Sequence, residues 1–558
     1  MKNELINENS LYLRQHSNNP VAWQAYKPET LRKALKENKP LFISIGYSSC
    51  HWCHVMAHET FEDEKAAEIL NKYFIPIKID REEFPAIDKM YQFYLHATGK
   101  KGGWPLSVFA LPDGRPFFGG TYFPPEQKHG LPAFKEIVTQ LGELFIKTPA
   151  EAKKYADNYD KFHDKFIAFD NEYEALAEIK TTDILDIFKK MFDIEHGGVG
   201  QDAKFPNIPV MSALLNYFDD DDVAIFLKMT ADKLCTTGIY DHINGGFYRY
   251  AVDRAWTVPH FEKMLYDNAL NASFLLNMFE LTDNILYLKV AEKTIDFILS
   301  EFNSDFGLIT AMDADSLDDT GKSVEGFYYL VTQKHIEPVA EFVELHEGVI
   351  NLKATTHEQY VSLEKHFEKL KVSNERVKPR KDEKVILSLN MLFCSTLLKM
   401  FEMSGKEFYM EQATALFGKL KHFLMIDDDL FRINYQGEIF GNTTLEDYAY
   451  TIKTLIDFFE VTKEKTFLGE AARFTEKAIE LFYCDGIFYL DPNKKVVDTF
   501  DDSTPNPSGL IIDILENYSD LMGIAKDSQS LDFAADRLIK YAGGHPTLFA
   551  SLKEYLGK

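Results

Sequence analysis

Cys50 and Cys53, two cysteines three positions apart, are the residues of this sequence best suited to chemistry. They stand in Cys50-His51-Trp52-Cys53-His54, after an apolar run at 41–45 and before a segment, 54–73, whose apolar residues recur at helical spacing. The pair therefore lies where a strand meets a helix. In a first helical turn both thiols face one side, with Cα atoms about 5–6 Å apart, which suits a disulfide. We predict a redox pair.

The place of each cysteine in the helix predicts its role. Cys50 stands at the helix N-terminus, where free N–H groups and the helix dipole stabilise a thiolate, so it is the expected nucleophile. Cys53, one turn further in, is the expected resolving thiol. His51 and His54 lie beside the pair, and a protonated imidazole there would make the disulfide more oxidising. Trp52 either presents its ring to an incoming polypeptide or small disulfide, or packs over the pair.

Zinc binding is an alternative chemistry for the same helix. Cys50, Cys53, His54 and His58 lie along one stripe, and thiolate and imidazole are zinc ligands. Ligands two turns apart are separated by about 12 Å along the axis, so one helix does not easily surround one ion. We therefore expect no metal and no other cofactor, with zinc at this helix as the alternative.

The elements around the cysteines follow the order of the thioredoxin fold. Apolar runs and helical periodicity predict strands at 41–45, 74–80, 106–111 and 116–119, and helices at 29–38, 54–73 and 88–98. Strand, CxxC helix, strand, helix, and a proline at the head of a hairpin is the thioredoxin arrangement, in which that proline is cis and faces the disulfide. We therefore predict a cis Trp104–Pro105 bond, although few X-Pro bonds are cis.

Length and charge bound the remaining possibilities. A chain of 558 residues exceeds one ordinary core and indicates about two to four domains. The net charge of -26 argues against nucleic acid and anionic membranes as partners. The polar stretch 1–10 lacks an apolar signal core and no run of about 18 apolar residues occurs, so we expect a cytoplasmic protein with no membrane partner. Five cysteines are too few for a disulfide scaffold.

The sequence divides into an α/β part and an all-α part. Residues 1–160 hold the predicted thioredoxin-like domain, 161–180 a charged connecting arm, and 181–558 a helical domain. Its roughly twelve helices begin near 181, 208, 221, 259, 283, 384, 405, 444, 466, 506, 527 and 545. Acidic turns recur at 193, 241, 305, 428 and 485, all but the one at 428 with glycine, and 334–381 looks like an insertion. Six such hairpins would close into an (α/α)6 toroid, while an open solenoid is the competing arrangement.

Acidic and aromatic residues gather in the loops of the helical domain. The candidate acid/base groups are His260, Glu262, Asp267, Asp313 and Asp315. Sugar hydrolysis uses two carboxyl groups, and epimerisation beside a carbonyl uses a base on each face, commonly histidine. The opposing interpretation is that these groups cap helices and satisfy buried turns. A sugar ligand in the toroid is thus one hypothesis for this domain.

Longer motifs carry a family resemblance. They are Ser10 to His16, Gly46 to Met56, Asp80 to Glu83, Gly102 to Pro105, Phe118 to Pro124, Val258 to Ala269 and Asp313 to Ser316. Together they resemble the thioredoxin-domain proteins related to spermatogenesis-associated protein 20 and bacterial YyaL. The resemblance implies a thioredoxin-like domain fused to a six-hairpin toroid similar to glycoside hydrolases and N-acylglucosamine 2-epimerases.

The sequence favours thiol-disulfide oxidoreduction as the function. Cys50 and Cys53 would react with a protein or small-molecule thiol or disulfide, Pro105 would shape the substrate groove, and Trp104 would lie beside the redox pair. One alternative is a sugar-active enzyme with a regulatory or structural thioredoxin domain. The other is a non-catalytic binding protein.

Overall fold

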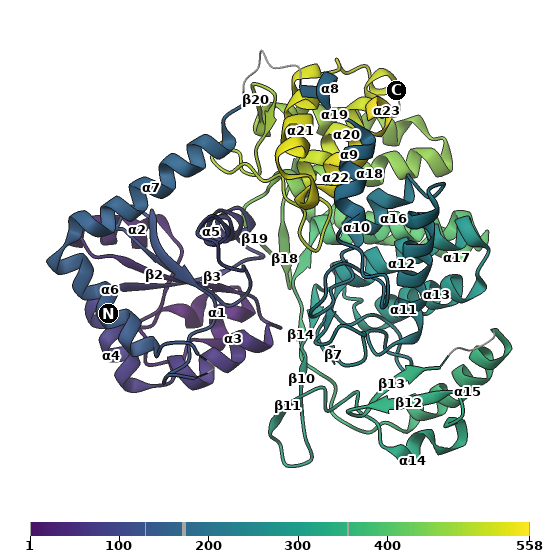
Figure 1. Cartoon of the computed structure of the whole chain (residues 1–558), viewed down its shortest axis with the longest axis horizontal. Coiled ribbons are helices and arrows are strands. Elements are labelled where there is room, and N and C mark those ends of the chain that lie inside the picture. Colours follow the sequence, from purple (N-terminus) through teal and green to yellow (C-terminus); the bar gives the residue numbers. More distant parts are fainter. Residues whose placement is uncertain (1, 129, 170–174, 354–356, 557–558) are drawn as a thin grey trace. The chain divides into compact units, whose positions relative to one another are not determined.

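Two compact units make up the chain. A computed structural model describes residues 2–128, 130–169, 175–353 and 357–556. Internal contacts separate Met1–Ala168 (unit 1) from Phe169–Lys558 (unit 2), and Figure 1 follows both along the sequence. The boundary thus falls at Ala168 rather than at the predicted residue 160.

A five-stranded sheet forms the centre of unit 1, in the order β1-β3-β2-β4-β5. The strands are β1 (Gln24–Ala25), β2 (Leu41–Gly46), β3 (Ile75–Asp80), β4 (Leu106–Ala110) and β5 (Pro116–Gly120). The first three run parallel, whereas β4 is antiparallel to β2 and to β5. The four predicted strands are confirmed, and β1 is too short for its pattern to have been predicted.

Helices cover both faces of this sheet. On one face Ile43 and Val108 belong to the apolar cluster that includes residues of α2 (Pro28–Glu37) and α5 (Pro85–Ala97). On the other face Phe42 and Phe109 pack with α3 (His51–Met56), α4 (Glu64–Tyr73) and α6 (Phe134–Lys147). Ser44 shares this second face, because side chains alternate along a strand. The helix with the two cysteines therefore covers a face that contains polar as well as aromatic side chains.

The helix predicted over 54–73 is interrupted. α3 passes into a π-helical turn, Ala57–Phe61, and α4 begins after Asp63. The Asp63 carboxylate accepts hydrogen bonds from the N–H groups of Lys65 (2.8 Å) and Ala66 (3.0 Å). An aspartate that caps the next helix is the sequence signal for this break.

Helix α7 (Pro149–Ile167) belongs to unit 1 and packs on α5 and β5. Phe93 of α5 contacts the rings of Phe162 and Phe166, and Ala152 and Ala156 are buried. The predicted connecting arm at 161–180 overlaps the end of α7. This helix has an apolar face among its many charged residues, so it packs on unit 1 instead of serving as an arm. Residues 170–174 of the predicted arm lie outside the described residues.

Six helices line the inside of unit 2 in the part of the chain that the structure describes. They are α10 (Ile208–Leu215), α12 (Leu265–Thr282), α16 (Leu387–Ser404), α18 (Leu445–Thr462), α20 (Pro507–Met522) and α22 (Pro546–Ser551). Each packs against the next, and α22 packs against α10, where Tyr217 stacks on Phe549. This last contact closes the ring, so the (α/α)6 toroid is confirmed and the open solenoid is wrong.

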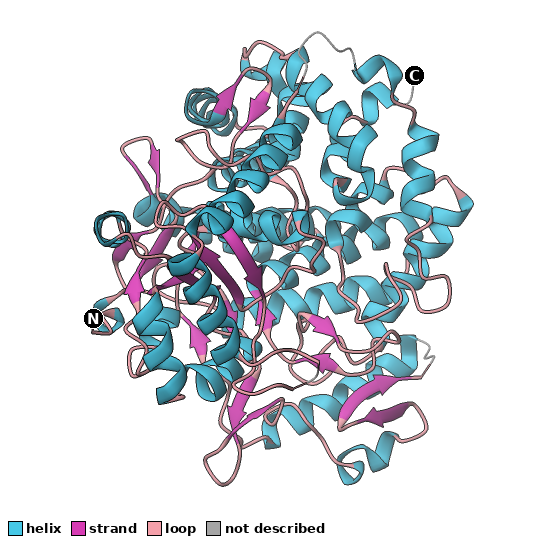
Figure 2. Cartoon of the chain, turned by 60° about the vertical axis from the view of Figure 1, so that its left-hand side comes forward, coloured by secondary structure: helices cyan, strands magenta, loops and turns pink. Residues whose placement is uncertain are grey.

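Outer helices alternate with the inner ones along the chain. They are α9 (Thr181–Lys189), α11 (Asp221–Thr236), α13 (Ile285–Glu301), α17 (Glu407–Leu424), α19 (Lys465–Phe482) and α21 (Ser528–Tyr541). The predicted helix starts agree closely, except that α12 begins at Leu265 rather than near 259. Pro259–His260 and Lys263–Met264 instead form the short strands β7 and β8. Helices (cyan) dominate this unit in Figure 2, with short strands between them.

The two ends of the ring differ in their connections. From inner to outer helix the chain turns within a few residues, for example Asp283–Asn284 between α12 and α13. From outer to inner helix it passes through longer loops, which hold the recurring acidic turns. The predicted insertion lies in one such loop and contains the hairpin β12 (Val343–His346) and β13 (Val349–Leu352) and helix α15 (His357–Ser373). Loops therefore gather at the N-terminal ends of the inner helices, where unbonded N–H groups also point.

Candidate functional site

Cys50 and Cys53 form a disulfide at the N-terminal end of α3. Cys50 is the N-cap residue, and its Sγ accepts a hydrogen bond from the Cys53 N–H at 3.2 Å. The two Cα atoms are 5.2 Å apart, and the residues are 3% and 2% exposed. The position at the helix start places Cys50 Sγ against helix N–H groups, which stabilise a thiolate once the bond is reduced.

Pro105 directly precedes β4, the strand that pairs with β2. The Trp104–Pro105 bond is cis, as predicted. The β2–β4 register pairs Ile45 with Leu106, which places Pro105 opposite Gly46. A Cβ added to Gly46 would lie 2.7 Å from Cys53 Sγ. Gly46 at the end of β2 therefore lies directly against the redox pair.

Side chains of α5 hold the loop that leads to Pro105. The Gln92 amide bonds both the N–H and the carbonyl of Gly103, each at 3.1 Å. Asp88 accepts a hydrogen bond from the Trp104 indole N–H at 2.9 Å. The Arg81 guanidinium lies 3.8 Å from the centre of the Trp104 ring and 3.6 Å from the Asp88 carboxylate. Trp104 is therefore fixed by a hydrogen bond at its edge and a cation on its face.

Trp52 offers an exposed aromatic surface beside Cys50. Its side chain is 45% exposed, and its ring centre lies 5.4 Å from that of Tyr122 and 5.9 Å from that of His51. The Tyr122 hydroxyl donates to Glu59 at 2.6 Å, which holds the second ring in place. Paired, partly exposed rings provide apolar contact area for a polypeptide or a small disulfide. His54, in contrast, is partly buried.

The inner side of the disulfide is polar and buried, a feature that was not predicted. A Cβ atom added to Gly46 would lie 2.5 Å from Tyr12 Oη, and this same Cβ would be close to Cys53 Sγ. Lys78 is 1% exposed, and its Nζ lies 2.9 Å from Ser44 Oγ. A lysine within the apolar run of β3 is the one sequence signal that points to this group.

The zinc alternative gains no support from this geometry. Across the described ranges, no group of three or more His, Cys, Asp and Glu side chains is arranged to hold a metal ion. The His58 imidazole points to Glu62, with Nδ1 2.8 Å from Oε1.

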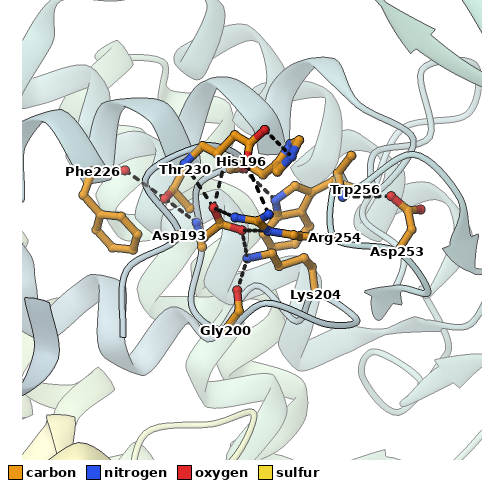
Figure 3. A network of polar contacts seen from close by, with 12 residues as sticks. Asp193, His196, Gly200, Lys204, Phe226, Thr230, Asp253, Arg254 and Trp256 are labelled. Atoms are coloured by element: carbon orange, nitrogen blue, oxygen red, sulfur yellow. Dashed lines mark hydrogen bonds and ion pairs between the residues drawn. The ribbon is translucent and has the colours of Figure 1, made fainter. Parts of the chain in front are cut away.

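In unit 2, buried ion pairs close two of the recurring turns. Around Asp193 the carboxylate accepts hydrogen bonds from the N–H groups of Glu195 and His196, from Lys204 Nζ at 2.8 Å, and from Arg254 at 2.7 and 2.8 Å (Figure 3). Burial alone would raise the pKa of Asp193, but these hydrogen bonds hold it well below its usual range. Asp193 is thus a charged structural centre of the turn.

Asp241 repeats the arrangement one hairpin later. Its carboxylate accepts hydrogen bonds from the N–H groups of Ile243 and Asn244 and lies 2.7 Å from Lys263 Nζ. The Lys263 amine also donates to the Gly245 carbonyl at 2.8 Å. The ion pairs and the turn hydrogen bonds therefore account for Asp193 and Asp241 as residues that stabilise the turns.

Carboxylates converge on Arg249 next to the start of α12. Arg249 Nη1 lies 3.2 Å from Glu262 Oε2, and both residues are buried. Burial works to lower the pKa of Arg249, but Tyr266, Glu262, Asp267 and Asp502 together hold it above its usual value. The structure thus pairs Glu262, one of the predicted acid/base candidates, with the Arg249 guanidinium, and the charge of Asp267, a second candidate, acts on the pKa of Arg249.

Both ring nitrogens of His260 face carboxylates. Nδ1 lies 2.6 Å from Glu325 Oε1, and Nε2 lies 3.6 Å from Glu262 Oε2. The ring stacks on Tyr250 with centres 4.8 Å apart and is 5% exposed as a residue. His260 therefore lies between two acids, with Glu325 at hydrogen-bond distance from one ring nitrogen.

Asp315 joins this group through a hairpin. It lies opposite Glu325 in the pairing of β10 (Asp315–Leu317) with β11 (Ser323–Glu325). The Asp313 carboxylate, at the start of the hairpin, accepts a hydrogen bond from the Asp315 N–H at 3.2 Å. Glu325 is thus the link between the predicted histidine and the predicted aspartates.

A thioredoxin-like unit followed by a closed ring of six helix pairs is the class of protein that these features define. Residues 2–163 match the family described as "Protein of unknown function, DUF255" (Thioredox_DsbH). The chain is 30% identical over 555 residues to spermatogenesis-associated protein 20 of Homo sapiens, covering 86% of this chain and 70% of that protein. The chain belongs to the family of spermatogenesis-associated protein 20. It is also 29% identical over 600 residues to "Uncharacterized protein B0495.5" of Caenorhabditis elegans, covering 93% and 81%.

Solved structures of remote sequence are similar to about two thirds of the chain. A sugar epimerase from a ruminal bacterium is 12% identical with a TM-score of 0.43, covering 66% of this chain and 84% of that chain. Cellobiose 2-epimerase from Spirochaeta thermophila is 13% identical with a TM-score of 0.43, covering 68% and 95%. The toroid assignment itself rests on the closed packing of the inner helices. None of the helices in the described ranges is long and apolar enough to span a membrane.

Proposed function

We propose that this protein is a thiol-disulfide oxidoreductase that acts through Cys50 and Cys53 on a protein or small-molecule thiol or disulfide. The observation that carries the proposal is the Cys50 sulfur at the N-cap of α3, in a disulfide with Cys53. The exposed ring of Trp52 supports a substrate that reaches Cys50 from solvent. A cytoplasmic location is part of the proposal and is supported by the low cysteine content.

The reaction proceeds in two exchanges. In the reducing direction, the Cys50 thiolate attacks a substrate disulfide, forms a mixed disulfide and releases the first substrate thiol. The Cys53 thiolate then attacks Cys50 Sγ, which restores the Cys50–Cys53 bond and releases the second substrate thiol. A dithiol reductant must afterwards reduce the pair. The oxidising direction is the reverse sequence.

The reduction potential of the pair tests the proposal directly. Equilibration in glutathione buffers, with alkylation of free thiols as the readout, should give a two-electron transition within about -270 to -120 mV, the range of known oxidoreductases. The value would also assign the direction of electron flow. Failure of Cys50 and Cys53 to oxidise together would contradict the proposal.

Replacing Cys53 by alanine should trap substrates on Cys50. Without the resolving thiol, the mixed disulfide has no intramolecular route to release. Cells that express Cys53→Ala should therefore yield adducts on non-reducing gels, identified by mass spectrometry after acid quenching. The double variant Cys50→Ala/Cys53→Ala is the control and should show none. Equal adducts in both proteins would assign them to another thiol.

A sugar-active unit 2, with unit 1 regulatory or structural, is the second candidate. It is favoured by the buried ion pair of Arg249 with Glu262 at the loop-bearing end of the ring, where the charge of Asp267 also raises the pKa of Arg249. Asp267→Asn keeps the side-chain shape, and Asp283→Asn at the other end of α12 is a matched control. A panel of sugars should show turnover or thermal protection that Asp267→Asn loses and Asp283→Asn keeps. No effect of any sugar on the unmodified protein would remove this candidate.

A further inference from the structure

We propose that unit 1 selects a polypeptide substrate, and that it does so through Trp52, whose ring is held in place by Tyr122 and Glu59. The expected substrate is a disulfide in an unfolded segment with an apolar side chain next to one cysteine. The inference rests on the proposed oxidoreductase function and deepens it, because that function leaves open whether the substrate is a protein or a small molecule. Trp52 is the recognition residue, whereas Glu59 and Tyr122 are positioning residues.

The π-helical turn after the redox helix, Ala57–Phe61, carries the positioning group. Such a turn inserts a residue into a helix, and it is frequent at functional sites. Two consecutive side chains of this turn bond two consecutive residues that follow β5. Glu59 accepts a hydrogen bond from the Tyr122 hydroxyl at 2.6 Å, and the buried Thr60 Oγ1 donates to the Phe123 carbonyl at 2.9 Å. The segment 122–123 is therefore fixed to the turn at two points.

Trp52 is restricted by its neighbours although it is exposed. Its ring centre lies 5.4 Å from that of Tyr122, with the two planes inclined by 59°, and 5.9 Å from that of His51. Rings at such separations and angles attract each other. An exposed tryptophan that exchanged rotamers freely would lose this freedom when a substrate binds, which weakens binding. The ring contacts therefore pre-organise the indole for a partner that packs on it.

The charged groups around these rings are paired with each other. Lys128 Nζ lies 3.7 Å from Glu59 Oε1, and His58 Nδ1 lies 2.8 Å from Glu62 Oε1. An aromatic centre with a polar rim is typical of surfaces that bind polypeptides. Glutathione disulfide, in contrast, is a small anion with little apolar area, and a chain of net charge -26 repels it at long range. Shape and charge thus both favour an apolar polypeptide.

Recognition by Trp52 precedes the chemical step and does not enter it. The substrate disulfide is reduced to two thiols while Cys50 and Cys53 are oxidised to their disulfide, through the two exchanges described above. The contact with the indole is made before Cys50 Sγ attacks and persists in the transition state. A contact of equal strength in both states changes the half-saturating substrate concentration rather than the maximum rate. This split distinguishes recognition from catalysis.

Single-turnover oxidation of the reduced, full-length protein tests the inference. The reductant is removed, a substrate disulfide is added, and acid quenching followed by alkylation of free thiols measures how much Cys50–Cys53 bond has formed. The first probe is a peptide with one internal disulfide, in which leucine and phenylalanine flank a cysteine. The second is the same peptide with serine at both positions, and the third is the neutral hydroxyethyl disulfide. The apolar peptide should half-saturate the protein at a concentration about 10-fold below that of either other probe.

Variants of the positioning group show whether the fixed ring matters. Glu59→Ala removes the acceptor of the Tyr122 hydroxyl and should raise the half-saturating concentration of the apolar peptide about 3–10-fold, with the effect on that concentration rather than on the maximum rate. Glu59→Gln keeps an acceptor and should restore the unmodified value. Glu143→Ala on α6 is the matched control, because Glu143 is also partly exposed and also paired with a lysine, and it should change nothing. In Trp52→Ala the two peptides should half-saturate the protein at the same concentration.

The outcomes separate this inference from the proposed function. Equal half-saturating concentrations for the two peptides in the unmodified protein would overturn the selection of an apolar polypeptide. A lower maximum rate in Glu59→Ala at an unchanged half-saturating concentration would also overturn it, since Glu59 would then act on the chemical step. If none of the three disulfides oxidises the unmodified protein, the proposed function itself fails, and the glutathione equilibrium of Cys50 and Cys53 provides the independent check on that result.

Discussion

Asp193→Ala should lower the free energy of unfolding of unit 2 by about 3–5 kcal/mol, because it leaves the buried Lys204 ammonium without its counter-ion. Lys204 and Asp193 are both fully buried, and Lys204 Nζ keeps only the Gly200 carbonyl when the carboxylate is removed. The turn also loses the acceptor for the N–H groups of Glu195 and His196. The same substitution thus removes an ion pair and a turn-closing acceptor.

Two spectroscopic signals separate the units in this measurement. Urea unfolding followed by far-ultraviolet circular dichroism reports mainly on the helices of unit 2. Tryptophan fluorescence reports mainly on unit 1, because Trp23, Trp52 and Trp104 lie there and Trp256 is in unit 2. Asp193→Ala should move the circular dichroism transition and leave the unit 1 signal in place. Coincident, unshifted transitions would mean that the turn does not stabilise the ring.

A double variant and a pH series check the physical cause. Asp193→Ala/Lys204→Met removes the stranded lysine and should recover part of the loss, because Arg254 is partly exposed and can turn to solvent. The folded-state pKa of Asp193 is depressed, so its contribution is present above the unfolded pKa of about 3.9 and is lost as the pH falls below it. The difference between Asp193→Ala and the unmodified protein should therefore shrink towards acid pH. A constant difference from neutral to acid pH would argue against an electrostatic origin.

Gly46→Ala should make the Cys50–Cys53 pair more oxidising. The added methyl group would lie 2.5 Å from Tyr12 Oη and 2.7 Å from Cys53 Sγ, closer than non-bonded atoms pack. Overpacking of this kind costs about 1–3 kcal/mol. A free Cys53 thiol can rotate away from the methyl group, whereas the sulfur of the disulfide cannot, so the strain falls mainly on the oxidised form. The reduction potential should rise by about 20–65 mV.

The measurement is the glutathione equilibrium used for the unmodified pair. Gly418→Ala on α17 is the matched control, because nothing lies within 4 Å of the added Cβ, and its potential should stay unchanged. An unchanged potential in Gly46→Ala would show that Tyr12 and Cys53 do not both pack on this glycine.

The sequence predicted elements well where periodicity and capping agree. The helices of unit 2 are long and amphipathic and follow recognisable turns, so their starts were close to those observed. Closure of the ring is different, because the contact between α10 and α22 joins segments more than 300 residues apart and depends on the geometry of every hairpin between them. Helix α7 was misjudged because its apolar face is hidden among charged residues.

The candidate sites were predictable only in part, for the same reason. The spacing of Cys50 and Cys53 fixes their mutual geometry within one helical turn. The tie between His260 and Glu325 spans 65 positions and is made by a hairpin whose place no local pattern reveals. Alternation within β3 predicts that Lys78 lies on the opposite face of the sheet from its apolar neighbours. Which helix covers that face is decided by tertiary packing.

The unequal ends of the ring have a consequence for how such a protein can change over evolutionary time. Tight turns such as Asp283–Asn284 couple the lengths of neighbouring helices, so an inserted residue there disturbs the packing of the helices that form the ring. A loop at the opposite end is only weakly constrained, because doubling its length costs about 0.6 kcal/mol in chain entropy. The hairpin and helix between α13 and α16 illustrate such growth. Relatives can therefore differ in the loops around the N-terminal ends of the inner helices while the ring of packed helices stays the same.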